Sequence, residues 1–218
     1  HAAVHAESNP TGTLSSMVYM AYNQRSLFVT GVWTTVQLAL AGTAIAFVLA
    51  LLMVFLRIQE PDKRNNDFVK IIKIVANKFA RFYIFVIRGT PMMVQSLIFY
   101  YAIFNLFKRT GMSVTEINRV WSLFISGLVT VSLNSTAYLA EVLRGGILAV
   151  DAGQMEAARS LGMTHWQAMR RVVFPQAIKN SLPAIGNEFI INIKDSSVLC
   201  VLLSLIHISE PTRLRCIS

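Results

Sequence analysis

Five polar residues near the end of a largely apolar stretch have the types needed to bind a small polar solute. Glu188, Asn192 and Asp195 are spaced i, i+4 and i+7, so a helix would place them on one face. Lys194 and Ser196 lie beside them. Carboxylates accept hydrogen bonds from cations, and an ammonium group donates them to anions. Because charges are costly in apolar surroundings, we expect this face either to line a cavity or to pair with itself or a neighbouring helix.

A second polar segment lies between apolar runs at residues 151–175, DAGQMEAARSLGMTHWQAMRRVVFP. Asp151 with Gln154 has the form of an N-cap and capping box, and Gly162 is a helix stop. These signals predict a short helix over residues 152–161.

Thr164 with Gln167 repeats the capping signal, which predicts a second helix that ends before Pro175. In the first helix, Ala157 and Ala158 have almost no side chain, so another protein could approach the backbone closely. A solvated hairpin would not need that alanine pair. We therefore expect this hairpin to contact a partner.

The composition indicates a membrane protein. Of the 218 residues, 54% are hydrophobic and only 14% are charged, and the mean hydropathy is +0.53. The formal net charge of +9 would raise nucleic acid as a partner of a soluble protein, but the basic residues here flank apolar runs. They fit membrane topology and anionic lipid better than nucleic acid.

Uncharged runs divide the chain into membrane crossings. Residues 26–56 carry no charge, and about 20 helical residues already cross ~30 Å of hydrocarbon. Further crossings are expected at 89–107 and 120–140, and residues 182–193 begin a fourth whose polar groups should line a cavity. Residues 134–136 are expected to make polar contacts between helices.

The loop at residues 57–88 is rich in Lys and Arg, which predicts a cytoplasmic loop and places residues 1–25 outside the cell. Apolar residues at helical spacing between Phe68 and Phe82 predict an amphipathic helix on the inner leaflet, with a soluble partner-binding helix as the alternative. Arg88 ends this loop. We interpret it as a structural or lipid-headgroup residue rather than a gating residue.

The hairpin resembles the EAA loop of ABC-importer membrane subunits. Glu156, Ala157 and Ala158 precede Gly162 by the spacing of that motif, and Val172, Phe174 and Pro175 complete the pattern. Other segments are similar to the permeases for polar amino acids in this family: residues 31–37 (GVWTTVQ), 86–95 (VIRGTPMMVQ), 141–146 (EVLRGG) and 194–197 (KDSS).

The resemblance implies an all-α, polytopic membrane protein with the transmembrane-subunit fold of type I ABC importers. The permease domain would cover residues 26–202, with the coupling loop at 144–179. Such subunits have five crossings, so the sequence is expected to be truncated after about four. The expected location is the cytoplasmic membrane of a prokaryote.

The resemblance also implies the partners. They are a second permease subunit, giving a homodimer or heterodimer, an ABC ATPase dimer that binds ATP and Mg, and an extracellular amino-acid-binding protein. No cofactor and no metal is expected in this chain, which is itself a transport subunit and not an enzyme. The residues expected to couple it to the ATPase are Glu156, Ala157, Ala158, Arg159, Leu161 and Gly162.

An amino acid substrate gives the polar face a specific interpretation. Glu188 or Asp195 would bind the ammonium group, Lys194 the carboxylate, and Ser196 would add a hydroxyl beside Asn192. Importers of this type often leave selection to the binding protein, so the absence of such a site would not change the predicted function.

The last residues, 203–218, are expected to be non-native. Their first part, LSLIHISEPTR, is what a transposase-type sequencing adapter would encode. His207 and Cys216 would then carry no functional information.

Two other classes fit the sequence less well. A membrane enzyme has little support, because His165 has no Ser, Cys or metal-ligand partner at useful spacing, and the chain lacks a G-x-x-x-x-G-K-[ST] phosphate loop. An ion-coupled secondary transporter or channel would suit Glu188 and Asp195, but it has no use for an alanine-faced hairpin.

Overall fold

The computed structural model describes residues 16, 22–23, 25–58 and 67–196. Within these residues the chain is helical and has no strand, which confirms the all-α expectation for this part. Residues 1–37 and residues 38–218 form separate units, and the packing below is that of the second. The helices are α2 (Arg25–Ile58), α3 (Asp67–Gly89), α4 (Met92–Arg109), α5 (Val114–Val120), α6 (Leu123–Leu148), α7 (Ala152–Ser160), α8 (His165–Ala168), a π-helical segment (Met169–Val173) and α9 (Phe174–Asp195).

Two of the described helices are long and apolar enough to cross a membrane, over Val29–Arg57 and Leu123–Leu148. Lys70–Gly89 and Met92–Arg109 pass the same test only as a pair, bent by 110°. Helix α9 is too polar to pass it, so the fourth crossing stays a prediction. Helix α6 extends to Leu148, past residue 140 where the crossing was expected to end. In this extension Glu141 pairs with Arg57 of α2 and with Arg144.

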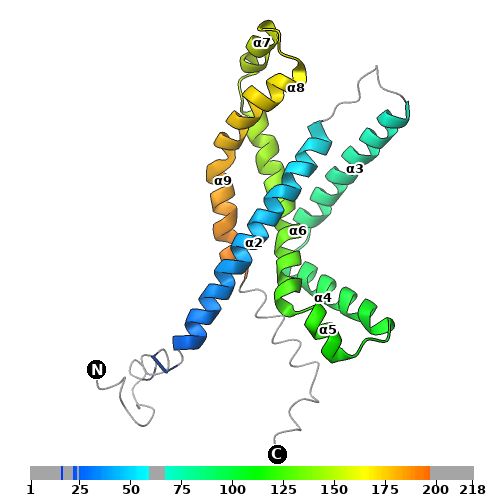
Figure 1. Ribbon diagram of the computed structural model, residues 1–218, viewed down its shortest axis with the longest axis vertical. Coiled ribbons are helices and arrows are strands. Elements are labelled where there is room, and N and C mark those ends of the chain that lie inside the picture. The colour runs from blue at the N-terminus through cyan, green and yellow to red at the C-terminus, as the bar shows by residue number, and fades with distance from the viewer. Residues whose placement is uncertain (1–15, 17–21, 24, 59–66, 197–218) are drawn as a thin grey trace, which may run out of the picture. The chain divides into compact units, whose positions relative to one another are not determined.

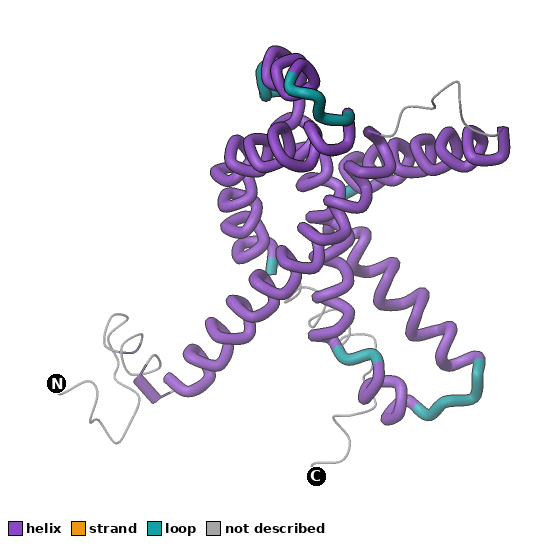
Figure 2. Tube along the Cα trace, turned by 45° about the horizontal axis from the view of Figure 1, so that its top comes forward, coloured by secondary structure: helices purple, strands orange, loops and turns teal. Residues whose placement is uncertain are grey.

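Helix α6 is the centre of the packing. Figure 1 shows α9 and α6 running side by side from the hairpin, and Figure 2 shows the same pairing from another angle. A core of small and branched side chains joins α2, α3 and α6: Ala46, Ala50, Val54, Ile84, Ile87, Ala137, Leu139, Ala140 and Leu143. Such small residues let helices approach closely in a membrane.

Polar side chains at one turn of α6 link it to its neighbours, as expected for residues 134–136. Asn134 Nδ2 donates to Gln95 Oε1 of α4 at 3.0 Å, and Ser135 Oγ donates to Asn192 Oδ1 of α9 at 2.8 Å. Asn192 Nδ2 in turn donates to Thr43 Oγ1 of α2 at 2.9 Å. These bonds satisfy groups that lipid could not.

Helix α3 has two different faces. Ala80, Ile84 and Ile87 are buried in the core, whereas the opposite side exposes Phe68, Ile71, Ile72, Val75, Phe79, Phe82 and Phe85. A helix thus forms in this loop, with the predicted apolar residues exposed along one side; its amphipathic role stays a prediction. Its placement on the inner leaflet stays a prediction.

The hairpin at residues 151–175 forms only partly as expected. Asp151 caps α7 by accepting from Gly153 N at 2.6 Å, and Gly162 ends the turn after it with φ +84°. Gln154 does not complete a capping box there but accepts from Gln176 Nε2 at 3.1 Å. Thr164 and Gln167 do form the second capping box.

The expected end of the second helix before Pro175 is wrong. Helix α8 continues through the π-helical segment into α9, so one helical stretch runs from His165 to Asp195. Pro175 falls in the first turn of α9, directly after the π-helical segment, and because it has no N–H the continuous helical stretch lacks one backbone hydrogen bond there. The wider π turn before it is the local adjustment that lets the helix pass.

Several expectations lie outside the described residues. They are the outer N-terminal segment up to residue 15, the tail at 203–218 and the stretch 197–202.

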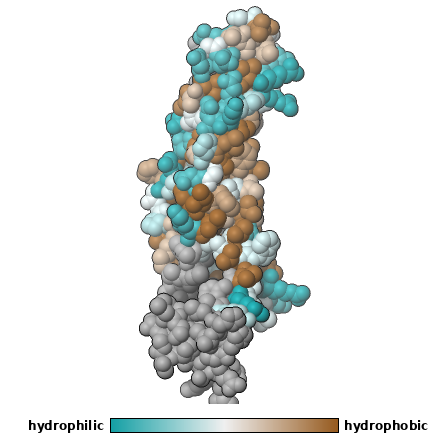
Figure 3. Space-filling view, turned by 90° about the vertical axis from the view of Figure 1, so that its left-hand side faces the viewer, coloured by the Kyte–Doolittle hydropathy of each residue, from teal (hydrophilic) through white to brown (hydrophobic). Residues whose placement is uncertain are grey.

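On the face shown in Figure 3, apolar side chains form much of the surface below the hairpin. That surface fits a protein surrounded by lipid.

Candidate functional site

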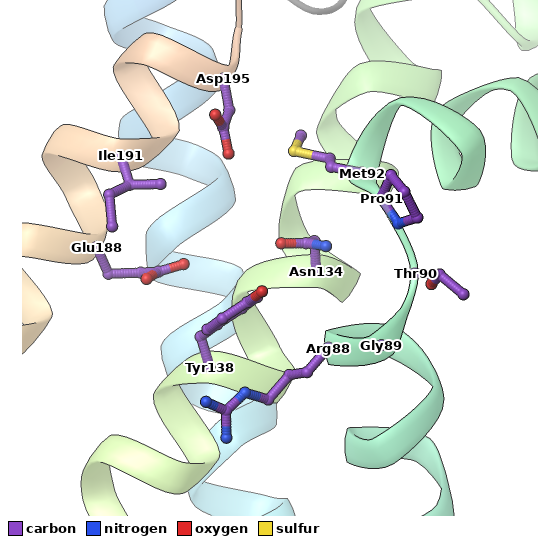
Figure 4. Close-up of a pocket in the computed structure, with 10 residues that line it drawn as sticks. All are labelled: Arg88, Gly89, Thr90, Pro91, Met92, Asn134, Tyr138, Glu188, Ile191 and Asp195. Carbon is purple, nitrogen blue, oxygen red and sulfur yellow. The ribbon is translucent and has the colours of Figure 1, made fainter.

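A pocket of about 480 Å³ lies where α6, α9 and the corner between α3 and α4 meet. Its volume is in the range of small-molecule sites, roughly 300–1,000 Å³. The lining residues are Arg88, Gly89, Thr90, Pro91, Met92, Asn134, Tyr138, Glu188, Ile191 and Asp195. Figure 4 shows Glu188 and Asp195 on α9, facing the α6 residues Asn134 and Tyr138 across the pocket.

The pocket has charges of both signs. Glu188 is buried, with only 6% of its surface exposed. Asp195, the last residue of α9, is half-buried. The guanidinium of Arg88 lies 5.1 Å from the centre of the Tyr138 ring, in cation–π contact. A solute with both an ammonium and a carboxylate group would find a partner for each here.

The structure brings together only two of the five residues first predicted for solute binding. Glu188 and Asp195 line the pocket. Asn192 is buried between α6 and α2, where it bonds Ser135 and Thr43, and Ser196 Oγ donates to Ile193 O of its own helix at 2.7 Å. These two residues do not line this pocket, and a role for them in solute binding stays a prediction.

Lys194 was expected to bind the carboxylate of the solute, but it does not line the pocket. It follows Ile193 on a different face of α9 from Glu188, so helix geometry turns it away. The cation in the pocket is Arg88. The interpretation of Arg88 as a structural or lipid-headgroup residue stays a prediction. The sequence signal for its place at the pocket is an arginine directly before a Gly-Thr-Pro helix break.

The hairpin exposes most of the residues predicted to contact a partner. Glu156, Ala157, Arg159 and Gly162 are exposed, and Leu161 has 81% of its surface free. Ala158 differs, because it is only 4% exposed and packs inside the hairpin. Its small size therefore serves packing within this chain.

Trp166 is an exposed hairpin residue that the sequence analysis did not select. It is 55% exposed, and its ring meets Phe55 of α2 edge-on with centroids 5.7 Å apart. A large, exposed apolar side chain on the hairpin fits a protein contact. The signal for Trp166 in the sequence is its position in the first turn of the second predicted helix, two residues after the N-cap Thr164.

The root of the hairpin is held by close packing and an ion pair. A Cβ at Gly146 would lie 2.7 Å from Ala177 O and would overlap Ser181 Oγ, so α6 and α9 touch there. Glu141 pairs with Arg57 and also with Arg144 Nε at 2.8 Å. The first contact joins α6 to α9 and the second joins α6 to α2, at the ends of these helices next to the hairpin.

The family model for the inner membrane component of binding-protein-dependent transport systems matches residues 71–209. This range covers more than half of the chain and includes the pocket, the hairpin and α9. The chain belongs to this family. The match also includes residues 203–209 of the expected non-native tail, which stays a prediction.

Within this permease family, the chain is 37% identical over 139 residues to the glutamine transport system permease protein of Escherichia coli, covering 64% of this chain and 58% of that one. It is 35% identical over 185 residues to the nopaline transport system permease protein of Agrobacterium fabrum, covering 83% of this chain and 68% of that one. The chain thus spans a little over half the length of the first relative.

A solved structure confirms the fold of the permease. A crystal structure described as an amino acid ABC transporter with histidines is similar with a TM-score of 0.68 and 38% identity, covering 95% of this chain and 87% of that one. The fold of an ABC-importer membrane subunit, expected from the hairpin motif, is therefore confirmed.

Proposed function

We propose that this chain is the membrane-spanning permease subunit of an ATP-driven importer for polar amino acids. It does not hydrolyse ATP. A separate ABC ATPase dimer binds ATP and Mg, and an extracellular binding protein delivers the amino acid. A second permease subunit completes the translocation path.

The single observation that carries this proposal is the exposed hairpin of α7 and α8. Its apolar residues Leu161 and Trp166 and its charged residues Glu156 and Arg159 are open to a partner. The hairpin continues without a break into α9 and packs at its root against α6. A displacement of the hairpin by an ATPase would therefore move the two helices that line the pocket.

The pocket supports an amino acid as the solute. Arg88 would bind the carboxylate group and Glu188 or Asp195 the ammonium group. The relatives named for glutamine and nopaline transport, and the solved structure with histidines, fit the same solute class.

The orientation rests on the distribution of charge. The basic loop that contains α3 and the hairpin with Arg159, Arg170 and Arg171 would face the cytoplasm, and the N-terminus would lie outside. This places the hairpin on the side where ATP is available.

The test is solute uptake by the permease reconstituted in proteoliposomes with its ATPase and binding protein. We expect uptake of a polar amino acid that requires enclosed ATP and that persists when ionophores collapse the proton and sodium gradients. A non-hydrolysable ATP analogue is the matched control and should give no uptake. Uptake that needs an ion gradient but no ATP would overturn the proposal.

A further inference from the structure

The corner between α3 and α4 is held by one buried side-chain amide. Gln95 is 5% exposed, and its Nε2, which has two hydrogens to donate, lies within hydrogen-bond distance of three acceptors: Ile87 O at 2.7 Å, Thr90 O at 3.0 Å and Thr90 Oγ1 at 2.7 Å. Its Oε1 accepts from Asn134 Nδ2 of α6 at 3.0 Å. This one residue therefore connects the end of α3, the start of α4 and the central helix.

The corner interrupts the helical path between the buried residues Ile87 and Gln95, while residues 88–91 between them are exposed. Helix α3 ends at Gly89 and α4 begins at Met92, so the last carbonyl groups of α3 have no partner within a helix. The Thr90 hydroxyl donates to Val86 O at 2.9 Å, and Gln95 donates to Ile87 O. Carbonyl groups left without hydrogen bonds away from water would destabilise this turn.

The same corner carries the cation of the pocket. Arg88 lies between Ile87 and Thr90, the two residues whose backbone carbonyls Gln95 holds, and Asn134 lines the pocket while it donates to Gln95. Gln95 itself does not line the pocket. Gln95 therefore bonds the backbone on both sides of Arg88.

We infer that Gln95 is a positioning residue, which fixes the α3–α4 corner so that Arg88 is placed to bind the carboxylate of the solute. This inference rests on the proposed function, because it assigns the carboxylate of an amino acid to Arg88. The affinity of the pocket then depends on an amide that never touches the solute.

The test is equilibrium binding to the purified permease–ATPase complex without its binding protein. The probe is whichever of L-glutamine, L-arginine and L-histidine the wild-type complex binds most tightly. Arg88→Gln should raise Kd about tenfold or more, the loss expected for a charge-assisted hydrogen bond. Gln95→Leu, which keeps the volume but has no polar atoms, should raise it by a similar factor.

Two further variants separate positioning from general destabilisation. In the double variant Gln95→Leu with Arg88→Gln, Kd should equal that of Arg88→Gln alone, because both changes remove the same contact. Gln95→Glu should bind poorly at alkaline pH, where the buried carboxyl group is ionised, because a carboxylate cannot donate to Ile87 O or Thr90 O. Its Kd should approach that of wild type as the pH falls and the acid regains a donor.

Ser96→Ala is the matched control. Ser96 is also fully buried on α4, but its hydroxyl bonds only Met93 O of its own helix at 2.8 Å. Its Kd should stay within about twofold of wild type. If Gln95→Leu does not assemble, the pH response of Gln95→Glu relative to wild type carries the test.

The outcomes separate this inference from the proposed function. If Arg88→Gln weakens binding but Gln95→Leu does not, or if their effects on Kd multiply in the double variant, Gln95 does not act through Arg88 and the inference fails alone. If the wild-type complex binds none of the three amino acids, or binds them equally well without Arg88, the pocket assignment fails with it. ATP-driven uptake would still be decided by the proteoliposome experiment.

Discussion

At the scale of single residues, two adjacent glycines of α6 have different surroundings. Gly146 faces α9, where a Cβ would come within 2.7 Å of the Ala177 carbonyl oxygen and would overlap the Ser181 hydroxyl. Gly145 has nothing within 4 Å of the same position. The absence of a side chain at Gly146 is thus what lets α6 and α9 pack closely at the root of the hairpin.

We expect Gly146→Ala to destabilise the permease by about 1–3 kcal/mol, because backbone cannot move aside as a flexible side chain can. Gly145→Ala adds the same methyl group in open space and should be neutral or stabilising by up to about 1 kcal/mol. Thermal unfolding of the two variants in detergent measures the difference. Equal melting temperatures would show that α6 and α9 are not in close contact at this point.

At the scale of elements, the hairpin depends on a glycine between α7 and α8. Gly162 has φ +84°, a left-handed conformation that other residues adopt only with strain. Gly111, between α4 and α5, has φ +85° and is equally open. A side chain at either glycine would be strained to a similar extent, because the two φ values are nearly equal. The two turns join different pairs of helices, so substitutions at these glycines can be compared directly.

Gly162→Val should abolish the stimulation of ATP hydrolysis by substrate while membrane insertion stays intact, because a strained turn displaces Leu161 from α7. Gly111→Val has a similar backbone penalty, about 1–2 kcal/mol, and should leave this stimulation close to that of wild type. The measurement is substrate-stimulated ATPase activity of the reconstituted complex. Full stimulation in Gly162→Val, or equal loss in both variants, would argue against a coupling role for the hairpin.

At the scale of the whole molecule, the proposed orientation predicts which turns lie in the cytoplasm and which lie outside the cell. The hairpin with Leu161 would lie in the cytoplasm, and the turn after α4 at Thr110 would lie outside. Both residues are exposed, so a reagent in the correct compartment can reach them.

In a variant without Cys200 and Cys216, Thr110→Cys should react with a membrane-impermeant maleimide added to intact cells. Leu161→Cys should react only after the membrane is disrupted. The charge of the loops decides this difference, since basic loops stay in the cytoplasm. The reverse labelling pattern would invert the topology and remove the hairpin from the reach of the ATPase.

Local signals in the sequence predicted the helices well where residues close in sequence determine where the helix begins and ends. The helix α7, the capping box at Thr164 and the glycine stop at Gly162 follow from hydrogen bonds within a few residues. The end predicted before Pro175 failed because a π turn accommodates the proline, and that depends on the packing of α9 against α6.

The sequence by itself determined the helical class, the two clearest crossings and the hairpin, because hydrophobic runs, charge and caps act over short distances. Only the tertiary structure decided the pocket. In the structure the cation that lines the pocket is Arg88 and not Lys194, and Asn192 and Ser196 make other contacts. Gln95 holds the corner between α3 and α4. The physical reason is that a pocket is formed by side chains from different helices, and their meeting depends on crossing angles and on the 110° bend that no local pattern specifies.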